Sequence, residues 1–482
     1  MIGRLTPLQG RLLLLVLCAP LLGLLGVIAA EAVPDSRIAD HLLDAERAGI
    51  LTRERGLREQ KRSTTPLDTV VQNPTECLAF SVGLGDQPGR NHVTTAIVSP
   101  VYNRNRAYIV CGRLGVVLDE YEATGQLEPG TTYLRYWHGY AVITRPGIGL
   151  FGLAGTRWIA FVLAAAAIGA MGFAIARAFG RAAAAILIGP VLLTTDTIIG
   201  GLSTTVAIST ASAWAGGWMT FALVSRRPDW KTAGVVAALA GVVSAYLDLM
   251  TTMPGAFALT VISAALGVLA ANGVAARGKA WRVSAAAAVG WIIGLVWMWG
   301  SKWVIAAIVV GVDKVVDTVR SQIDFRLSGQ RVDPSWAGGL TETLSTWWDK
   351  PLTPWVVFAV AAMVAVVAVY GRRRGHVMVG TGLCVAITVV PVVAWYLALN
   401  QHSQNHQWLL YRSHPIAFGA IGALVYAAMR PPLGPPVDAP GSSSAAEATA
   451  GSTFEAALTK TPQSPGQSVD RARLGASPSR PR

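Results

Sequence analysis

The residues of this chain that could carry chemistry include two carboxylates at the edges of apolar segments. Glu76 lies in the stretch Asn73–Leu78, and Asp248 lies on the last apolar turn of a segment that ends before Pro254. Ionisable side chains in or near hydrocarbon are costly, so a chain that only had to cross a membrane would not need them. A carboxylate in such a position could act as a general base or hold a metal ion. Both residues are therefore candidate catalytic groups.

Each carboxylate also has a simpler structural interpretation. Asn73 could cap the helix that follows it, which would make the stretch around Glu76 an ordinary turn. Thr251 and Thr252 could likewise cap the helix that Pro254 opens. The sequence alone leaves both interpretations open.

Basic and aromatic side chains gather at similar boundaries. Arg135 and His138 fall in the aromatic stretch Tyr133–Tyr140, and Lys302 lies among tryptophans in an apolar run. A guanidinium flanked by aromatic rings suits a phosphate or a sugar face, so these are candidate substrate-binding residues. The structural alternatives are an interfacial aromatic belt and a lysine that snorkels to the interface. The functional interpretation of Lys302 is a pair with Asp248 or with an anionic ligand.

Two further motifs supply basic groups nearer the C-terminus. Arg326 lies in the stretch Ser321–Ser328, where a solvated loop is the simpler account. His402 and His406 are four residues apart, so a helix would place both on one face, and Arg412 follows them. That spacing is common for metal ligands, but no matching carboxylate motif accompanies it, and a divalent metal ion stays the weaker hypothesis. Hydrogen bonds to a phosphate or to sugar hydroxyls fit equally well.

Composition indicates the class of protein that must position these groups. Of the 482 residues, 52% are hydrophobic and 14% are charged, well below the roughly 25% charged residues of soluble domains. Apolar runs recur that approach the roughly 20 residues needed to cross a bilayer. Much of the excess behind the net charge of +13 sits in short loops between these runs, which favours membrane orientation over nucleic-acid binding. The predicted fold class is an all-α polytopic membrane protein.

Ten membrane-spanning helices are predicted from these runs. They are expected at about 12–30, 156–176, 182–200, 204–224, 232–250, 255–273, 284–308, 354–370, 376–397 and 414–429. The first run is long for a signal-peptide core, so an uncleaved signal anchor is preferred over a cleaved signal peptide. With both termini cytoplasmic in a multi-pass protein of the cell membrane, all the basic clusters between spans lie on the cytoplasmic side.

Four parts of the chain follow from this topology. Residues 1–30 contain the first span, 31–150 form a large extracytoplasmic loop domain, and 151–430 form a multi-helix membrane domain. Residues 431–482 are rich in Pro, Ser, Ala and Gly and lack an apolar period, which predicts a disordered cytoplasmic tail.

Three local features are predicted within the loop. Apolar residues at helical spacing over 38–45 predict an amphipathic helix along the membrane surface. Two apolar runs, 107–110 and 115–118, fit short strands or buried turns. Cys77 and Cys111 are the only cysteines of the loop, so a disulfide bond is expected in an oxidising compartment, with two buried thiols as the alternative.

Several motifs in combination resemble a family of uncharacterised bacterial polytopic membrane proteins over residues 65–428. The motifs are NPTECLAF, YLRYWHGY, YLDLMTTMP, SKW, FRLSG and HSQNHQWLLYR. In that family the first motif more often carries Asp, so Glu76 is a conservative departure. The layout also resembles that of the GT-C glycosyltransferases, which have a first span, a large outer loop with acidic residues and a membrane-surface helix, and then many spans. Those enzymes transfer sugars from polyprenyl-phosphate donors on the outer face.

This resemblance in layout implies a GT-C-like transferase that moves a sugar from a polyprenyl-phosphate donor to an envelope acceptor. Glu76 would be the base, with Asp248 as an alternative base or metal ligand. The donor phosphate would be held by Arg135, Lys302, Arg326 and Arg412, and the acceptor or a metal ion by His402 and His406. The partners implied are membrane lipid and the lipid-linked sugar.

Two other functions fit the same residues. A transporter or flippase of a lipid-linked or anionic substrate would use the basic groups for binding, but it would need access from both faces. A non-catalytic membrane scaffold would need none of these groups for chemistry. No Walker loop, Rossmann fingerprint, nucleophile elbow or kinase signature occurs in the sequence, which argues against ATP-driven transport and soluble cofactor chemistry.

Overall fold

The fold is built from helices throughout the part of the chain that the structure describes. The structure is a computed structural model, and it describes residues 5–51, 74–85, 91–101, 110–195, 197, 203–248, 250–273, 276–327, 335–372 and 379–429. No strand occurs in these ranges, where the only β pairing is an isolated bridge between Val101 and Thr131. The all-α class is therefore confirmed. The predicted tail, 431–482, and Asn73 lie outside the described residues.

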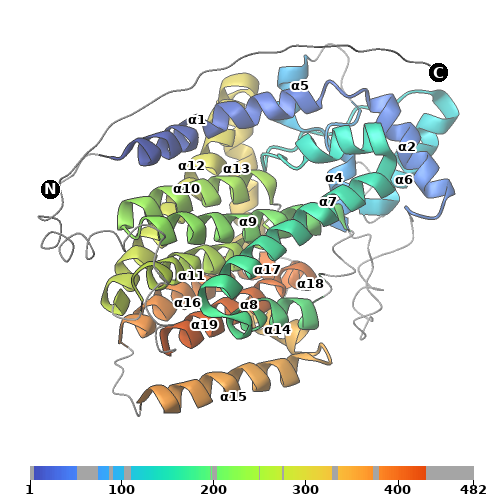
Figure 1. Ribbon diagram of the computed structural model, residues 1–482. Helices are drawn as coiled ribbons and strands as arrows, with labels where there is room; N and C mark the ends of the chain where they lie inside the picture. Colours follow the sequence, from blue (N-terminus) through green and yellow to red (C-terminus); the bar gives the residue numbers. More distant parts are fainter. Residues whose placement is uncertain are drawn as a thin grey trace, which may run out of the picture. The chain divides into compact units, whose positions relative to one another are not determined.

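The helices fall into two groups along the chain (Figure 1). The first group is α1 (Pro7–Ala30), α2 (Asp35–Arg47), α4 (Pro74–Ser81), α5 (His92–Val98) and α6 (Val110–Thr124). The second group is α7 (Ala141–Phe179), α8 (Arg181–Thr194), α9 (Thr204–Arg226), α10 (Trp230–Leu247), α11 (Met253–Asn272), α12 (Arg277–Val310), α13 (Val312–Leu327), α14 (Gly338–Trp348), α15 (Thr353–Arg372), α16 (Val379–Ala398), α17 (Asn400–Asn405), α18 (Gln407–Leu410) and α19 (Ser413–Met429).

Several of these helices are long and apolar enough to cross a membrane. Among the described residues they are α1, α7, α10, α11, α12 and α16, and the pair α14 and α15, which meets at 93°, adds a seventh if it counts as one span. The remaining predicted spans coincide with α8, α9 and α19, which do not meet both criteria. A multi-pass membrane protein is thus confirmed, while the count of ten spans stays a prediction.

Helix α11 lies at the centre of the bundle. Its residues 253–269 are all buried, as expected for a helix that is apolar on every side. Beside it, α10 and α12 approach closely through small residues. A Cβ added at Gly290 would overlap the carbonyl oxygen of Gly234, and one at Gly294 would overlap that of Ala238. Glycine at these positions therefore lets the two backbones come into contact.

Two predictions for the segment after α1 have different outcomes. The helix predicted over 38–45 is confirmed as α2, whose buried residues include Ile38, Leu42 and Ala45. The strands or buried turns suggested for 115–118 are wrong, because this run lies inside α6. The other run ends at Val110, where α6 begins, and its residues 107–109 lie outside the described ranges.

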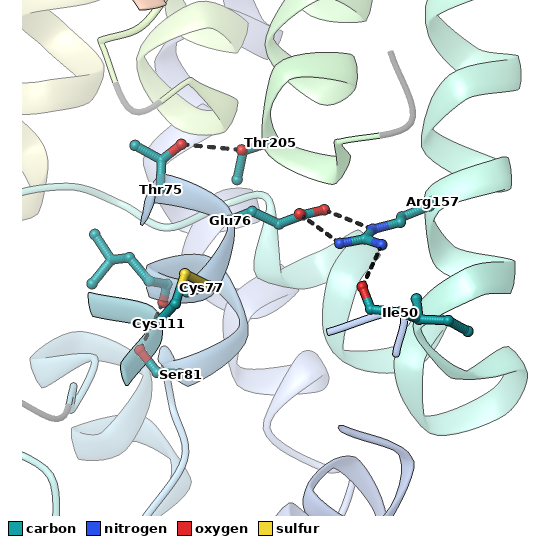
Figure 2. Close-up of a disulfide and its surroundings, with 9 residues drawn as sticks. Ile50, Thr75, Glu76, Cys77, Ser81, Cys111, Arg157 and Thr205 are labelled. Atoms are coloured by element: carbon teal, nitrogen blue, oxygen red, sulfur yellow. Dashed lines mark hydrogen bonds and ion pairs between the residues drawn. A yellow bond between two sulfur atoms is a disulfide. The ribbon is translucent and has the colours of Figure 1, made fainter. Parts of the chain in front are cut away.

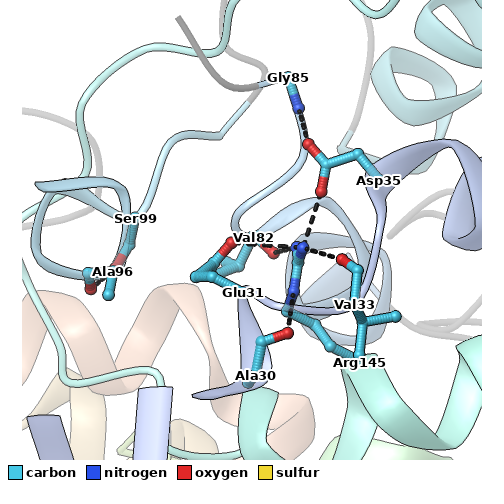
Figure 3. Close-up of polar contacts among 9 residues, drawn as sticks. All are labelled: Ala30, Glu31, Val33, Asp35, Val82, Gly85, Ala96, Ser99 and Arg145. Atoms are coloured by element: carbon cyan, nitrogen blue, oxygen red, sulfur yellow. Dashed lines mark hydrogen bonds and ion pairs between the residues drawn. The ribbon is translucent and has the colours of Figure 1, made fainter. Parts of the chain in front are cut away.

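Helix α7 is broken near its start, and buried arginines lie on both sides of the break. Gly152, at φ 67°, interrupts the helix two residues after the predicted domain boundary. Before the break, Arg145 joins the end of α1 to the start of α2 (Figure 3). Its Nε donates to the carbonyl of Ala30 at 3.1 Å, and its Nη2 forms ion pairs with Glu31 at 3.2 Å and Asp35 at 2.7 Å. The guanidinium therefore anchors this junction to the membrane helices.

Candidate functional site

The expected disulfide bond is confirmed and joins α4 to α6. The sulfur atoms of Cys77 and Cys111 are 2.03 Å apart, and both side chains are buried (Figure 2). Because α4 has only eight residues, this covalent link helps to hold it in place, and α4 carries Glu76.

Glu76 is fully buried, at 0% exposure, and interacts with Arg157 and the start of α9. Its Oε2 accepts a hydrogen bond from Arg157 Nη2 at 2.9 Å, and its Oε1 accepts one from Arg157 Nε at 3.2 Å (Figure 2). Its Oε1 also accepts from the backbone N–H of Thr204 at 2.8 Å and from Thr204 Oγ1 at 3.0 Å. A negative charge at a helix N-terminus is favourable. Glu76 therefore stabilises α9 and neutralises a buried guanidinium.

The two buried arginines of α7 were not singled out from the sequence. Arg157 also donates to the carbonyl of Ile50 at 3.1 Å, so it connects three segments of the chain. A sequence signal for them does exist, because an arginine in an apolar helix is expected to have an acidic partner. The number of acidic residues in the preceding loop leaves the choice of that partner open.

Asp248 follows α10 and interacts with the start of α11. Its Oδ1 accepts from the backbone N–H of Thr251 and from Ser209 Oγ, both at 2.8 Å. Its Oδ2 accepts from the backbone N–H of Thr252 at 2.8 Å and from Thr252 Oγ1 at 3.0 Å, and Thr251 Oγ1 donates to Oδ1 at 2.5 Å. Thr252 makes no side-chain cap of its own. The carboxylate itself therefore satisfies the first amides of α11.

The two candidate carboxylates contact the same half of α9. Glu76 contacts Thr204 and Asp248 contacts Ser209. These α9 residues are five positions apart, which is about 7.5 Å along a helix axis. The structure therefore brings together two acidic residues that are distant in the sequence, each held by several donors of the fold.

Lys302 has a different environment. It is 1% exposed, its Nζ donates to the carbonyl of Ile97 at 2.6 Å, and it lies 5.5 Å from the ring centroid of Trp137. Trp137 in turn donates to the carbonyl of Met298. Within the described ranges, Lys302 forms no ion pair with a carboxylate. The predicted pair with Asp248 is therefore wrong, since Asp248 binds the start of α11 instead.

The other predicted residues of the aromatic stretch lie close to Lys302. The His138 Nδ1 is 2.8 Å from the hydroxyl of Tyr140, and the rings of His138 and Tyr133 are 5.1 Å apart. Arg135 places its guanidinium 5.2 Å from the ring of Tyr133. We call Lys302, Trp137 and these four residues the Lys302 cluster. Burial, and secondly the charge of Lys302, lower the pKa of His138 well below its ordinary value, so the ring is neutral at pH 7.

Backbone strain occurs at the same places. Of the described residues, Ser99 (φ 45°), His138 (φ 56°) and Met250 (φ 63°) are the non-glycine residues with positive φ. His138 belongs to the Lys302 cluster, Ser99 follows Ile97 by two positions, and Met250 follows Asp248 by two. Such conformations cost about 1–3 kcal/mol each and cluster at functional sites.

The remaining predicted residues lie in the C-terminal third. His402 and His406 lie close together, with ring centroids 4.7 Å apart. Arg412 lies 5.1 Å from the ring of Tyr411. Arg326 lies in helix α13 rather than in the expected loop, and its side chain is outside the described residues. In the part of the chain that is described, no group of three or more His, Cys, Asp or Glu side chains could hold a metal ion.

Contacts across the chain connect these groups. The backbone N–H of Gly139, beside the Lys302 cluster, donates to the carbonyl of Tyr246 at 2.9 Å, close to Asp248. A Cβ added at Gly255, near the start of α11, would lie 3.1 Å from the Cα of Ser413, at the start of α19. The motifs therefore meet where α10 ends and where α11 and α19 begin.

A cavity of about 460 Å³ lies apart from these contacts. It is bordered by α14, α15 and α19, and its lining is mainly apolar: Leu344, Ser345, Trp347, Trp348, Val357 and Phe418. Comparison with protein-family models, curated proteins and solved structures finds no match for the chain.

Proposed function

We propose that this protein is a GT-C-like glycosyltransferase of the cell membrane that transfers a sugar from a polyprenyl-phosphate donor to an envelope acceptor on the outer face. The observation that supports the proposal is the buried ammonium of Lys302, which has a carbonyl and an aromatic ring as its described neighbours. A buried charge without a counter-ion is costly, and an ionisable group in a membrane helix is expected to serve a function. A donor phosphate would supply the missing negative charge.

In the proposed reaction, a hydroxyl of the acceptor attacks the anomeric carbon of the donor sugar. The new glycosidic C–O bond forms as the bond to the phosphate oxygen breaks, and the hydroxyl proton passes to a base. Lys302 and Arg135 stabilise the charge that develops on the leaving phosphate, and Arg326 and Arg412 are proposed to support this binding. The neutral ring of His138 offers a hydrogen bond without adding a second cation.

Glu76 is the proposed base, and Asp248 is assigned a structural role. Asp248 receives five hydrogen bonds from neighbouring residues, four of them from the two threonines that precede α11. A base must have an oxygen within reach of the substrate proton. Glu76 would meet this condition if the substrate replaced one of its contacts with Arg157 or Thr204.

A transporter or flippase is the second candidate, and the same carboxylates favour it. Both are held by donors from within the protein, which suits a protein that binds an anion without performing acid–base chemistry. The Lys302 cluster would then recognise the phosphate of a lipid-linked substrate during its passage.

The test is reconstitution of the purified protein in vesicles with radiolabelled polyprenyl-phosphate sugars. We expect transfer of label to an envelope acceptor fraction, and about 10- to 150-fold weaker donor binding in Lys302→Gln, as expected for the loss of a charged hydrogen bond worth about 1.5–3 kcal/mol. Lys279→Gln, at an exposed position of the same helix α12, is the matched control. Movement of labelled lipid across the bilayer without transfer would support the flippase instead. Absence of both activities with all donors would leave the scaffold.

A further inference from the structure

Helices α17 and α18 contain buried polar atoms that have no hydrogen-bond partner among the described residues. They are the amide nitrogen and oxygen of Gln401, Oγ of Ser403, Nδ2 of Asn405 and Nε1 of Trp408. Gln401 is 3% exposed and Ser403 is 0% exposed. Buried polar groups in proteins are almost always hydrogen-bonded, so a cluster of exceptions indicates partners from outside the chain.

The order of these residues places polar groups beside aromatic rings. Gln401 and Asn405 are four positions apart in α17, so they lie on one face of that helix. His402 and His406 occupy the adjoining face, and the ring of His406 is 6.4 Å from that of Trp408. An amide offers both donors and an acceptor, and a hydroxyl offers both roles, whereas an indole only donates.

The backbone around these groups is held in position. Asn400, at the start of α17, accepts a hydrogen bond from the backbone N–H of Gly339 at 2.6 Å and donates to the carbonyl of Ser335 at 2.7 Å. A Cβ added at Gly339 would lie 2.7 Å from the Cβ of Ser403. Helix α14 therefore packs directly on α17. A fixed set of polar groups is what selective binding of a small ligand requires.

The chemistry of the groups narrows the class of ligand. The four side chains with unpartnered atoms are neutral, and an indole N–H cannot bind a metal ion. Their mixture of donors and acceptors matches hydroxyl groups, which both donate and accept. Rings beside such groups match the apolar face of a sugar.

We infer that α17 and α18 form a carbohydrate-binding subsite in which Gln401, Ser403, Asn405 and Trp408 bind sugar hydroxyls. As the site of the acceptor sugar, this inference rests on the proposed transferase function. As a binding site for neutral saccharides, it stands on the unpartnered atoms alone. Those atoms leave the donor phosphate to the Lys302 cluster.

The test uses the full-length protein in nanodiscs and three soluble probes: methyl α-D-mannopyranoside, methyl α-D-arabinofuranoside and N-acetylglucosamine. We expect saturable binding of at least one probe by saturation-transfer NMR, weakened at least tenfold in Gln401→Leu. This substitution removes polar atoms that have no protein partner, so the melting temperature should stay the same or rise. Gln126→Leu, at an exposed position, is the control. Asn405→Leu gives a second, independent variant.

Two results would overturn the inference. One is the absence of saturable binding for all three probes, and the other is unchanged binding in both leucine variants, which would mean that the polar atoms hold only water. Hydrolysis of the polyprenyl-phosphate donor in the absence of acceptor separates this inference from the proposed function. Donor hydrolysis without probe binding would reject the subsite alone. Probe binding without any donor turnover would reject the transferase and leave the subsite standing.

Discussion

The buried charges of Glu76 and Lys302 are held in opposite ways. Glu76 contacts the guanidinium of Arg157 and the N-terminus of α9, so its negative charge is met by groups of the protein itself. The positive charge of Lys302 is met by one carbonyl and one ring. A charge that is paired within the fold explains itself by structure, whereas a buried charge without a counter-ion lowers stability and indicates a ligand. The environment of a buried charge therefore separates structural groups from candidate binding groups.

The largest effect on stability is expected for Glu76→Ala. The substitution leaves the buried guanidinium of Arg157 without its carboxylate and removes an acceptor from the start of α9. We expect a loss of about 3–5 kcal/mol in the free energy of unfolding, as for other broken buried ion pairs. The measurement is denaturant unfolding in nanodiscs, followed by circular dichroism. The double variant Glu76→Leu, Arg157→Met should recover much of the loss. A single variant within 1 kcal/mol of the wild type would remove the distinction between the two charges.

Removal of the disulfide bond should have the next largest effect. Cys77→Ser with Cys111→Ser opens a link of sequence separation 34, and we expect it to lower the unfolding free energy by about 2–4 kcal/mol. The effect sharpens the comparison, because α4 presents Glu76 to Arg157. Cys18→Ser changes a free cysteine of α1 and should leave the melting temperature unaltered. Equal melting temperatures for the double variant and the wild type would show that α4 is held by packing alone.

A smaller loss is expected for Asp248→Asn. The side-chain amide would place an N–H group where two donors of Thr251 or Thr252 now find an oxygen, so at least one donor is left unsatisfied. We expect a loss of about 1–3 kcal/mol in unfolding free energy. Thermal unfolding measured by intrinsic fluorescence checks the value. A gain in stability would indicate that Asp248 is held under repulsion and would return it to the candidate bases.

Lys302→Met should have a different outcome from the carboxylate variants. Methionine has a similar length without the charge, so the unfolding free energy should change by less than about 1 kcal/mol or increase. Binding of the lipid-linked donor should be lost at the same time, measured with radiolabelled donor in nanodiscs. A variant that unfolds easily and still binds the donor would show that Lys302 is a structural group like Glu76.

The smallest effect concerns the pH dependence of stability around His138. Its pKa in the folded protein lies well below the ordinary value of 6.5, so the unfolded chain binds the proton more readily and stability is lost as the pH falls through about 6.5. Lys302→Met removes the second cause of the shift and leaves burial, so the loss between pH 7.5 and pH 5.5 should become smaller. Melting temperatures across that range check the difference. A steeper loss in the variant would contradict the proximity of the two side chains.

Much of the architecture could be predicted from local properties of the chain. Long apolar runs predict membrane helices because length and hydrophobicity decide whether a helix can cross a bilayer. The periodicity over 38–45 predicted α2, and the pair Cys77 and Cys111 was identified because the loop has only these two cysteines. Short runs were less informative. The run 115–118 fits a strand or a turn by itself, but it is helical within α6, where Cys111 is linked to α4.

The partners of the charged residues could not be predicted in this way. The sequence by itself determined the membrane class, the helical fold and the types of residue that could bind an anion, because these depend on composition and on neighbours along the chain. Only the tertiary structure decided that Glu76 pairs with Arg157, 81 positions away, and that Lys302 meets the carbonyl of Ile97, 205 positions away. Electrostatic interactions depend on distance in space and on burial, and both are set only when the helices pack.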